Sequence, residues 1–179
     1  MTPAGDRSDR ARRLPPGVVP ERPGPGQESV WDDPRPPALL ADRRTVVVTF
    51  GGEVCRTDRA HRVCETSHPP TWYLPRDAFA AGVLVPAQGQ SMCEWKGLAS
   101  YLDVVSADGR VAARAAWTYP GPTPAFAALV DHVALYPGAV DEVTVDGEVV
   151  RAQPGSFYGG WVTDDVVGPF KGAPGSMGW

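Results

Sequence analysis

Three short glycine-containing turns interrupt the valine- and threonine-rich middle of the sequence. Gly51-Gly52, Asp108-Gly109 and Asp146-Gly147 each lie between two segments with strand-forming side chains. Two-residue turns of this composition are typical of β-hairpins. Hairpins join antiparallel strands directly, whereas parallel strands need long crossover connections. The sequence therefore predicts a mainly β fold built from antiparallel sheets.

One segment departs from this pattern. Residues 124–132 begin with a proline after Thr123, a residue that can cap a helix, and apolar side chains then recur three and four residues apart. Such a stripe indicates a helix that packs one face on a sheet. We therefore expect one short helix beside the strands.

The composition changes near residue 28. Residues 1–27 are rich in proline, glycine and arginine and contain little that a core could bury, which predicts a disordered N-terminal arm. Residues 28–179 are expected to form a single β-rich domain, including a C-terminal tail rich in glycine and aromatic residues. A total length of 179 residues is ordinary for one domain with a tail.

Charge and cysteine content narrow the functional classes. The net charge of −4 lacks the basic excess of nucleic-acid binders, and no apolar run reaches the roughly 18 residues of a membrane span. An odd count of 3 cysteines at irregular spacing favours reduced thiols, and we expect a cytoplasmic protein. The oligomeric state is left open, and a homo-oligomer is compatible with the sequence.

Reactive side chains are concentrated between Ser91 and Gly97. Within this segment Cys93, Glu94, Trp95 and Lys96 place a thiol, a carboxylate, an indole and an amine side by side. We expect the segment on a loop at the beginning of a strand, where functional residues are common. Both lysines of the chain follow an aromatic residue and precede a glycine, which suggests that these amines are needed.

Metal binding, phosphate binding and nucleophilic catalysis are the kinds of chemistry that such a cluster can support. Neither paired CxxC nor HxxxH zinc motifs nor a glycine-rich phosphate loop is present, so no metal site is predicted and no cofactor is identified. Cys93 could act as a nucleophile, because the nearby Lys96 amine would favour its thiolate. A base is then required, and His68 or Glu65 is the candidate.

Three stretches resemble a known family. They are Glu65-Thr66-Ser67-His68-Pro69-Pro70-Thr71-Trp72-Tyr73-Leu74-Pro75, Ser91-Met92-Cys93-Glu94-Trp95-Lys96-Gly97-Leu98-Ala99-Ser100-Tyr101 and Ala116-Trp117-Thr118-Tyr119-Pro120. Together they are similar to the domain of unknown function 427 family, over about Val30 to Lys171. The resemblance implies a compact fold of the β-tent kind in bacterial cytoplasm. The family sometimes carries a nucleotidyltransferase-like label, and its motif matches Glu65, Tyr73, Cys93, Lys96, Gly97, Tyr101, Trp117 and Tyr119.

These observations support one leading hypothesis and two alternatives. The leading hypothesis is a domain that binds a small anionic ligand in an aromatic cleft; its candidate ligand-binding residues are Lys96, Tyr73, Trp95, Tyr101, Trp117 and Tyr119. The first alternative is a cysteine-dependent or nucleotidyltransferase-like enzyme, with Cys93, Glu65 and His68 as candidate catalytic residues. The second is a protein-interaction module that recruits a partner through the arginine-bearing arm.

Overall fold

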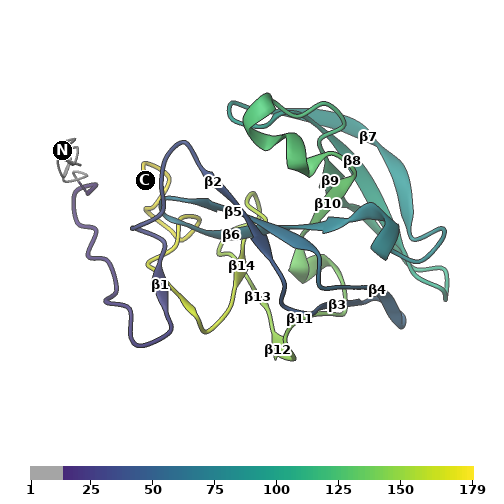
Figure 1. Ribbon diagram of the computed structural model, residues 1–179, viewed down its shortest axis with the longest axis horizontal. Coiled ribbons are helices and arrows are strands. Elements are labelled where there is room, and N and C mark those ends of the chain that lie inside the picture. The colour runs from purple at the N-terminus through teal and green to yellow at the C-terminus, as the bar shows by residue number, and fades with distance from the viewer. Residues whose placement is uncertain (1–13) are drawn as a thin grey trace, which may run out of the picture.

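A computed structural model describes residues 14–179 and shows a fold dominated by antiparallel sheets (Figure 1). The larger sheet has seven strands in the order β2-β5-β6-β10-β9-β8-β7. Their bounds are β2 (Ala38–Asp42), β5 (Ala60–Glu65), β6 (His68–Pro75), β10 (His132–Leu135), β9 (Val111–Thr118), β8 (Gly97–Val105) and β7 (Leu84–Cys93). The predicted fold class, mainly β with antiparallel sheets, is confirmed.

A second sheet and two strand pairs complete the fold. The second sheet has four strands in the order β12 (Glu148–Val149), β11 (Glu142–Val145), β3 (Val46–Thr49) and β4 (Glu53–Thr57). β1 (Glu28–Ser29) pairs in parallel with β15 (Val166–Val167), and β13 (Arg151–Ala152) pairs with β14 (Trp161–Val162). The helical segments are the short 3₁₀ turns η1 (Arg76–Ala78), η2 (Pro124–Leu129) and η3 (Pro137–Ala139).

The three predicted glycine turns each close a hairpin. Gly51-Gly52 joins β3 to β4, Asp108-Gly109 joins β8 to β9, and Asp146-Gly147 joins β11 to β12. In the last of these turns both residues have positive φ, +47° and +83°. A type I′ turn requires that conformation, and Asp-Gly adopts it at low cost.

Two apolar cores lie on opposite sides of the larger sheet. The main core fills the space between the two sheets, and it contains Val46, Trp72, Val104 and Val143 from four different strands. The smaller core lies on the other face, beneath η2. Its buried members are Val63, Tyr73, Ala99, Trp117, Tyr119, Phe126, Leu129 and Ala134, and the candidate site lies at its edge.

The predicted helix is shorter and of a different kind. η2 is a 3₁₀ segment that ends at Leu129, with a kink at Phe126, instead of continuing to His132. Asp131 then takes a positive φ of +57°, and His132 begins β10. β10 lies between β6 and β9, where its backbone bonds to both neighbours, so tertiary pairing overrides the local helical pattern.

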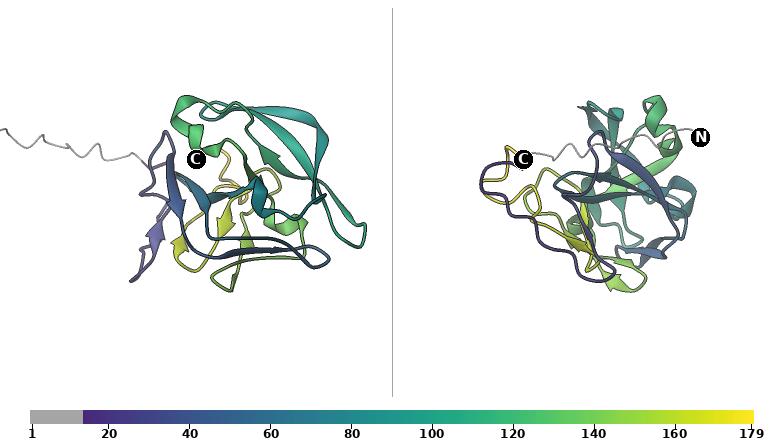
Figure 2. Two further views of the ribbon diagram at one scale, coloured as in Figure 1. Left: turned by 45° about the vertical axis from the view of Figure 1, so that its right-hand side comes forward. Right: turned by 60° about the vertical axis from the view of Figure 1, so that its left-hand side comes forward.

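The described part of the predicted arm lies on the domain surface. Val18 is buried in a small apolar cluster with Val30 and Val166, and the Glu21 amide donates to the Gly168 carbonyl at 2.8 Å. Both views of Figure 2 show the C-terminal segment beside β1. The rest of the predicted arm, residues 1–13, lies outside the described residues, and the boundary between arm and domain stays a prediction. No helix in residues 14–179 is long and apolar enough to cross a membrane.

Candidate functional site

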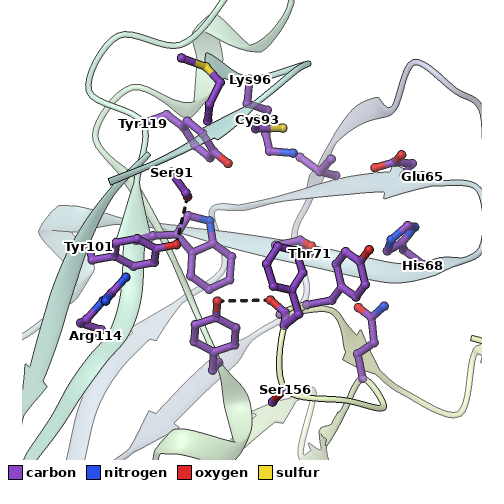
Figure 3. A pocket seen from close by; sticks show the side chains of 18 residues that line it. Glu65, His68, Thr71, Ser91, Cys93, Lys96, Tyr101, Arg114, Tyr119 and Ser156 are labelled. Atoms are coloured by element: carbon purple, nitrogen blue, oxygen red, sulfur yellow. Dashed lines mark hydrogen bonds between the residues drawn. The ribbon is translucent and has the colours of Figure 1, made fainter. Parts of the chain in front are cut away.

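A cavity of about 480 Å³ lies at the edge of the smaller core, between the β7–β8 hairpin and a C-terminal loop (Figure 3). This volume is within the usual range for small-molecule sites. The walls come from strands β5 to β9, from residues 153–159 and from three residues outside the strands, Lys96, Tyr119 and Tyr136. The lining residues are Val63, Glu65, His68, Thr71, Ser91, Met92, Cys93, Lys96, Tyr101, Arg114, Trp117, Tyr119, Tyr136, Gln153, Ser156, Phe157, Tyr158 and Gly159.

The reactive cluster forms the tip of the β7–β8 hairpin. Cys93 pairs with Gly97, which leaves three residues in the loop, and Gly97 has the positive φ of +98° that this tight reversal requires. Thr123, which lies outside the hairpin, holds the tip through two hydrogen bonds. Thr123 donates its hydroxyl to the Trp95 carbonyl at 2.6 Å and its amide to the Lys96 carbonyl at 3.1 Å. The backbone that carries Lys96 is therefore fixed against the segment before η2.

Lys96 is a buried cationic residue with no ion pair to an acidic residue of the described chain. Its side chain is only 9% exposed, and Nζ lies 5.8 Å from the ring centres of Tyr119 and Phe126. Within residues 14–179 it makes neither an ion pair nor a hydrogen bond through Nζ. In the described part of the chain, Nζ contacts aromatic ring faces, which attract a cation weakly. Lys96 is thus a cation of the cavity without a carboxylate partner among residues 14–179.

The β5–β6 turn presents His68 to the same cavity. The buried Ser67 takes a φ of +70°, and its amide and carbonyl are bonded to the Val30 carbonyl and the Lys171 amide. His68 Nδ1 lies 3.0 Å from the Thr66 carbonyl oxygen. A carbonyl can only accept, so Nδ1 carries the proton and Nε2 of the neutral ring is left with its lone pair.

Glu65 lies across this turn from His68, and its charge is already balanced. Arg35 Nε is 3.0 Å from Glu65 Oε1, and the same guanidinium donates to the Thr66 carbonyl. Arg35 also lines a smaller cavity of about 280 Å³, which shares Glu65, His68 and Cys93 with the larger one. The two cavities therefore meet where the candidate catalytic residues lie.

Burial keeps the phenols of this region neutral. Burial raises the pKa of Tyr119 far above its usual range, and the neighbouring Tyr73 and Cys93 raise it further. Burial is also the main cause that raises the pKa of Tyr73. Both side chains therefore act as polar neutral groups near neutral pH.

The structure brings most of the candidate site residues together. Seven of them line the larger cavity: Glu65, His68, Cys93, Lys96, Tyr101, Trp117 and Tyr119. Trp95 lines only the smaller cavity. Tyr73 lines neither, because it is 1% exposed and packs beneath Tyr119, with ring centres 6.3 Å apart. Tyr73 is thus placed to support the cavity wall from behind.

One family model matches the segment that carries most of these residues. The family model described as domain of unknown function (DUF427) matches residues 38–146. The chain belongs to the DUF427 family. A search of curated proteins found no match. The DUF427 segment contributes Glu65, His68, Cys93 and Lys96 to the cavity, whereas the wall formed by residues 153–159 follows the matched region.

Two parts of the cavity were not predicted. Arg114 is within the DUF427 segment but reads as an ordinary outward-facing strand residue. The C-terminal wall, with Phe157 and Tyr158, is predicted from the sequence only as part of a glycine- and aromatic-rich tail of the domain. Its position depends on contacts between residues far apart in the sequence, such as the Tyr136 hydroxyl to the Phe157 carbonyl at 3.4 Å. The abundance of glycine and aromatic residues was the only local signal for this wall.

We expect His68 to make the stability of this DUF427 protein depend on pH. Burial lowers the pKa of His68, and the nearby Lys171 and Arg35 act in the same direction, while the Thr66 carbonyl and Glu65 oppose them. The unfolded chain then binds more protons than the folded one below about pH 6.5, so stability falls as the pH is lowered. The loss is at most about 1.4 kcal/mol per pH unit for one histidine.

Denaturant unfolding between about pH 5 and 7 measures this slope. His68→Gln should make it shallower. His61, whose pKa burial also lowers, contributes separately, and His61→Gln is the matched control. An unchanged slope in His68→Gln would contradict the neutral, buried state of His68.

Proposed function

We propose that the cavity binds a small anion, with Lys96 as the principal contact. The supporting observation is a lysine that is only 9% exposed as a residue, lines the cavity and has no acidic partner in residues 14–179. Removing such a charge from water costs several kcal/mol unless a counter-charge compensates it. A bound anion would supply that counter-charge.

The other charges of the cavity agree with this proposal. Its only carboxylate, Glu65, is neutralised by Arg35, and the second cation, Arg114, forms no ion pair in the described part of the chain. The remaining surface is largely aromatic, as ligand sites commonly are. These side chains together make a positively charged pocket with apolar walls. Such a pocket favours an anion attached to a flat or apolar body.

Titration of the protein with benzoate and with its neutral isostere benzamide tests the proposal. Trp117 lines the cavity, so its fluorescence reports occupancy, and calorimetry supplies an independent affinity. We expect benzoate to bind and benzamide to bind at least about tenfold more weakly, as the loss of one charged hydrogen bond predicts. Equal binding of the two would contradict an anion site.

A specific observation also supports a second candidate, a cysteine-dependent enzyme. Cys93 and His68 line both cavities at the place where these meet. His68 Nδ1 is engaged by the Thr66 carbonyl, so Nε2 is the nitrogen available to take a proton from a thiol. The bound anion would then be a substrate whose reactive centre lies beside Cys93.

Alkylation with iodoacetamide separates the two candidates. Cys55 and Cys64 are buried, and burial raises the pKa of both thiols to about 12, so they should be protected in the folded protein. We expect mass spectrometry to find one modified residue, the half-buried Cys93. The enzyme candidate further requires that Cys93 react faster than free cysteine at neutral pH and that His68→Gln slow this reaction. A rate no faster than free cysteine would leave only the binding function.

A further inference from the structure

Arg114, the second cation of the cavity, is positioned by an irregularity in β9. The register between β8 and β9 shifts between Leu102 and Val104, and Arg114 takes the left-handed conformation with a φ of +51°. This conformation is unfavourable for a residue with a side chain, by roughly 1 kcal/mol or more. The Asp103 carboxylate compensates by accepting the Arg114 amide at 2.7 Å. Bulges of this kind commonly redirect a side chain next to a functional site.

The guanidinium group of Arg114 lies over an aromatic ring and beside a glycine. Its central carbon lies 4.3 Å from the ring centre of Tyr101. Gly89 approaches from β7, and a Cβ atom at that position would lie 3.3 Å from Nη2, so the absence of a side chain leaves room for the group. No carboxylate pairs with Arg114 in residues 14–179. A stacked guanidinium with free N–H groups suits bidentate binding of a carboxylate or phosphate.

Arg114 and Lys96 lie over different aromatic rings of one cavity. Arg114 stacks on Tyr101, which pairs with Trp117 across the strands, whereas Lys96 lies over Tyr119, two residues further along the chain. Diagonal positions of this kind are about 7–8 Å apart at the backbone. Figure 3 shows Lys96 and Arg114 at separate edges of the cavity, with aromatic side chains between them.

We infer that the ligand carries two separated anionic groups on a flat or apolar body. One group is neutralised by Lys96 at the buried end, and the other is held by the two N–H groups at the edge of Arg114. The aromatic surface between the cations accommodates the body. This inference rests on the proposed anion-binding function and narrows its ligand class from anions in general to dianions.

Terephthalate and its monoamide, terephthalamate, test the inference directly. They have the same shape, and they differ only in whether the second group is charged. We expect calorimetry to show terephthalate binding about ten- to a hundredfold more tightly, as one charged hydrogen-bonded contact predicts. The comparison is repeated with biphenyl dicarboxylate and its monoamide, so that a mismatch in length does not decide the result.

Substitutions then test whether Arg114 causes the difference in affinity between the dianion and its monoamide. In Arg114→Gln the dianion should lose its advantage, while the affinity for terephthalamate stays nearly unchanged. Arg22→Gln, which removes an exposed arginine that lines neither cavity, should behave as the unmodified protein. Arg114→Lys keeps the charge but not the planar fork and should recover only part of the advantage.

The outcomes separate this inference from the function on which it rests. Dianions of both lengths that bind no tighter than their monoamides would overturn the inference and leave a monoanion site. An advantage that survives in Arg114→Gln would also overturn it. If neither benzoate nor any of the dianions binds, the proposed function itself fails.

Discussion

Lys96→Met is expected to make the protein more stable and to abolish most of its anion binding. The methionine side chain has a similar length and no charge, so it removes an unpaired ammonium from a position that is only 9% exposed. We expect the free energy of unfolding to rise by roughly 1–3 kcal/mol, because the desolvation cost exceeds the weak attraction of two ring faces. The affinity for benzoate should fall about ten- to a hundredfold.

The opposite signs of the two effects make this prediction specific. A lysine with only a structural role would stabilise the fold, and its removal would lower stability. Lys171 is the matched control, because it also follows an aromatic residue and precedes a glycine, yet its Nζ donates to the Trp179 carbonyl at 2.6 Å. Lys171→Met should therefore destabilise the chain. Thermal unfolding of both variants decides the point, and a destabilised Lys96→Met would refute our interpretation of this amine.

Gly159→Ala is expected to displace one wall of the cavity. A Cβ atom at this position would lie 2.2 Å from Cη2 of Trp117, which is closer than two carbon atoms can approach. Trp117 is packed against Tyr136, with ring centres 4.7 Å apart, so it has little freedom to retreat. Either the C-terminal wall or the indole must move, at a cost of roughly 1–3 kcal/mol.

Two measurements detect this displacement, the unfolding temperature and the affinity for benzoate. The unfolding temperature of Gly159→Ala should fall, and its affinity for benzoate should fall with it, because the Trp117 indole lines the cavity. Gly178→Ala is the control, since a Cβ atom at that glycine meets nothing within 4 Å. If Gly159→Ala bound benzoate as tightly as the unmodified protein, the C-terminal wall would have no part in the site.

The features that could be predicted from the sequence are those whose cause is local. The turn chemistry of Asp146-Gly147 acts over adjacent residues, so its hairpin could be predicted without any knowledge of the fold. The segment of Cys93 and Lys96 was expected on a loop at the beginning of a strand, and in the structure it is the tip of the β7–β8 hairpin. These residues were recognised as a unit because they are contiguous in the sequence.

The features that could not be predicted depend on distant partners. In the sequence, Arg114 has the pattern of an ordinary outward-facing strand residue. In the structure, the Asp103 side chain binds the Arg114 amide at the bulge, and the Arg114 side chain lies over Tyr101. β10 is only four residues long, and its place in the sheet is set by pairing with both β6 and β9. The sequence cannot distinguish a tyrosine that lines the cavity from one that is buried behind it. Only the packing of Tyr119 against Tyr73 shows that Tyr73 does not reach the cavity.

The division of the cavity between the family segment and the chain that follows it matters for protein engineering. Both unpaired cations lie within residues 38–146, whereas the opposing wall is formed by residues 153–159. The two cations and the opposing wall of the cavity are therefore encoded in separate stretches of the gene. A combinatorial library confined to Ser156, Phe157 and Tyr158 would vary the opposing wall of the cavity and leave the two cations in place.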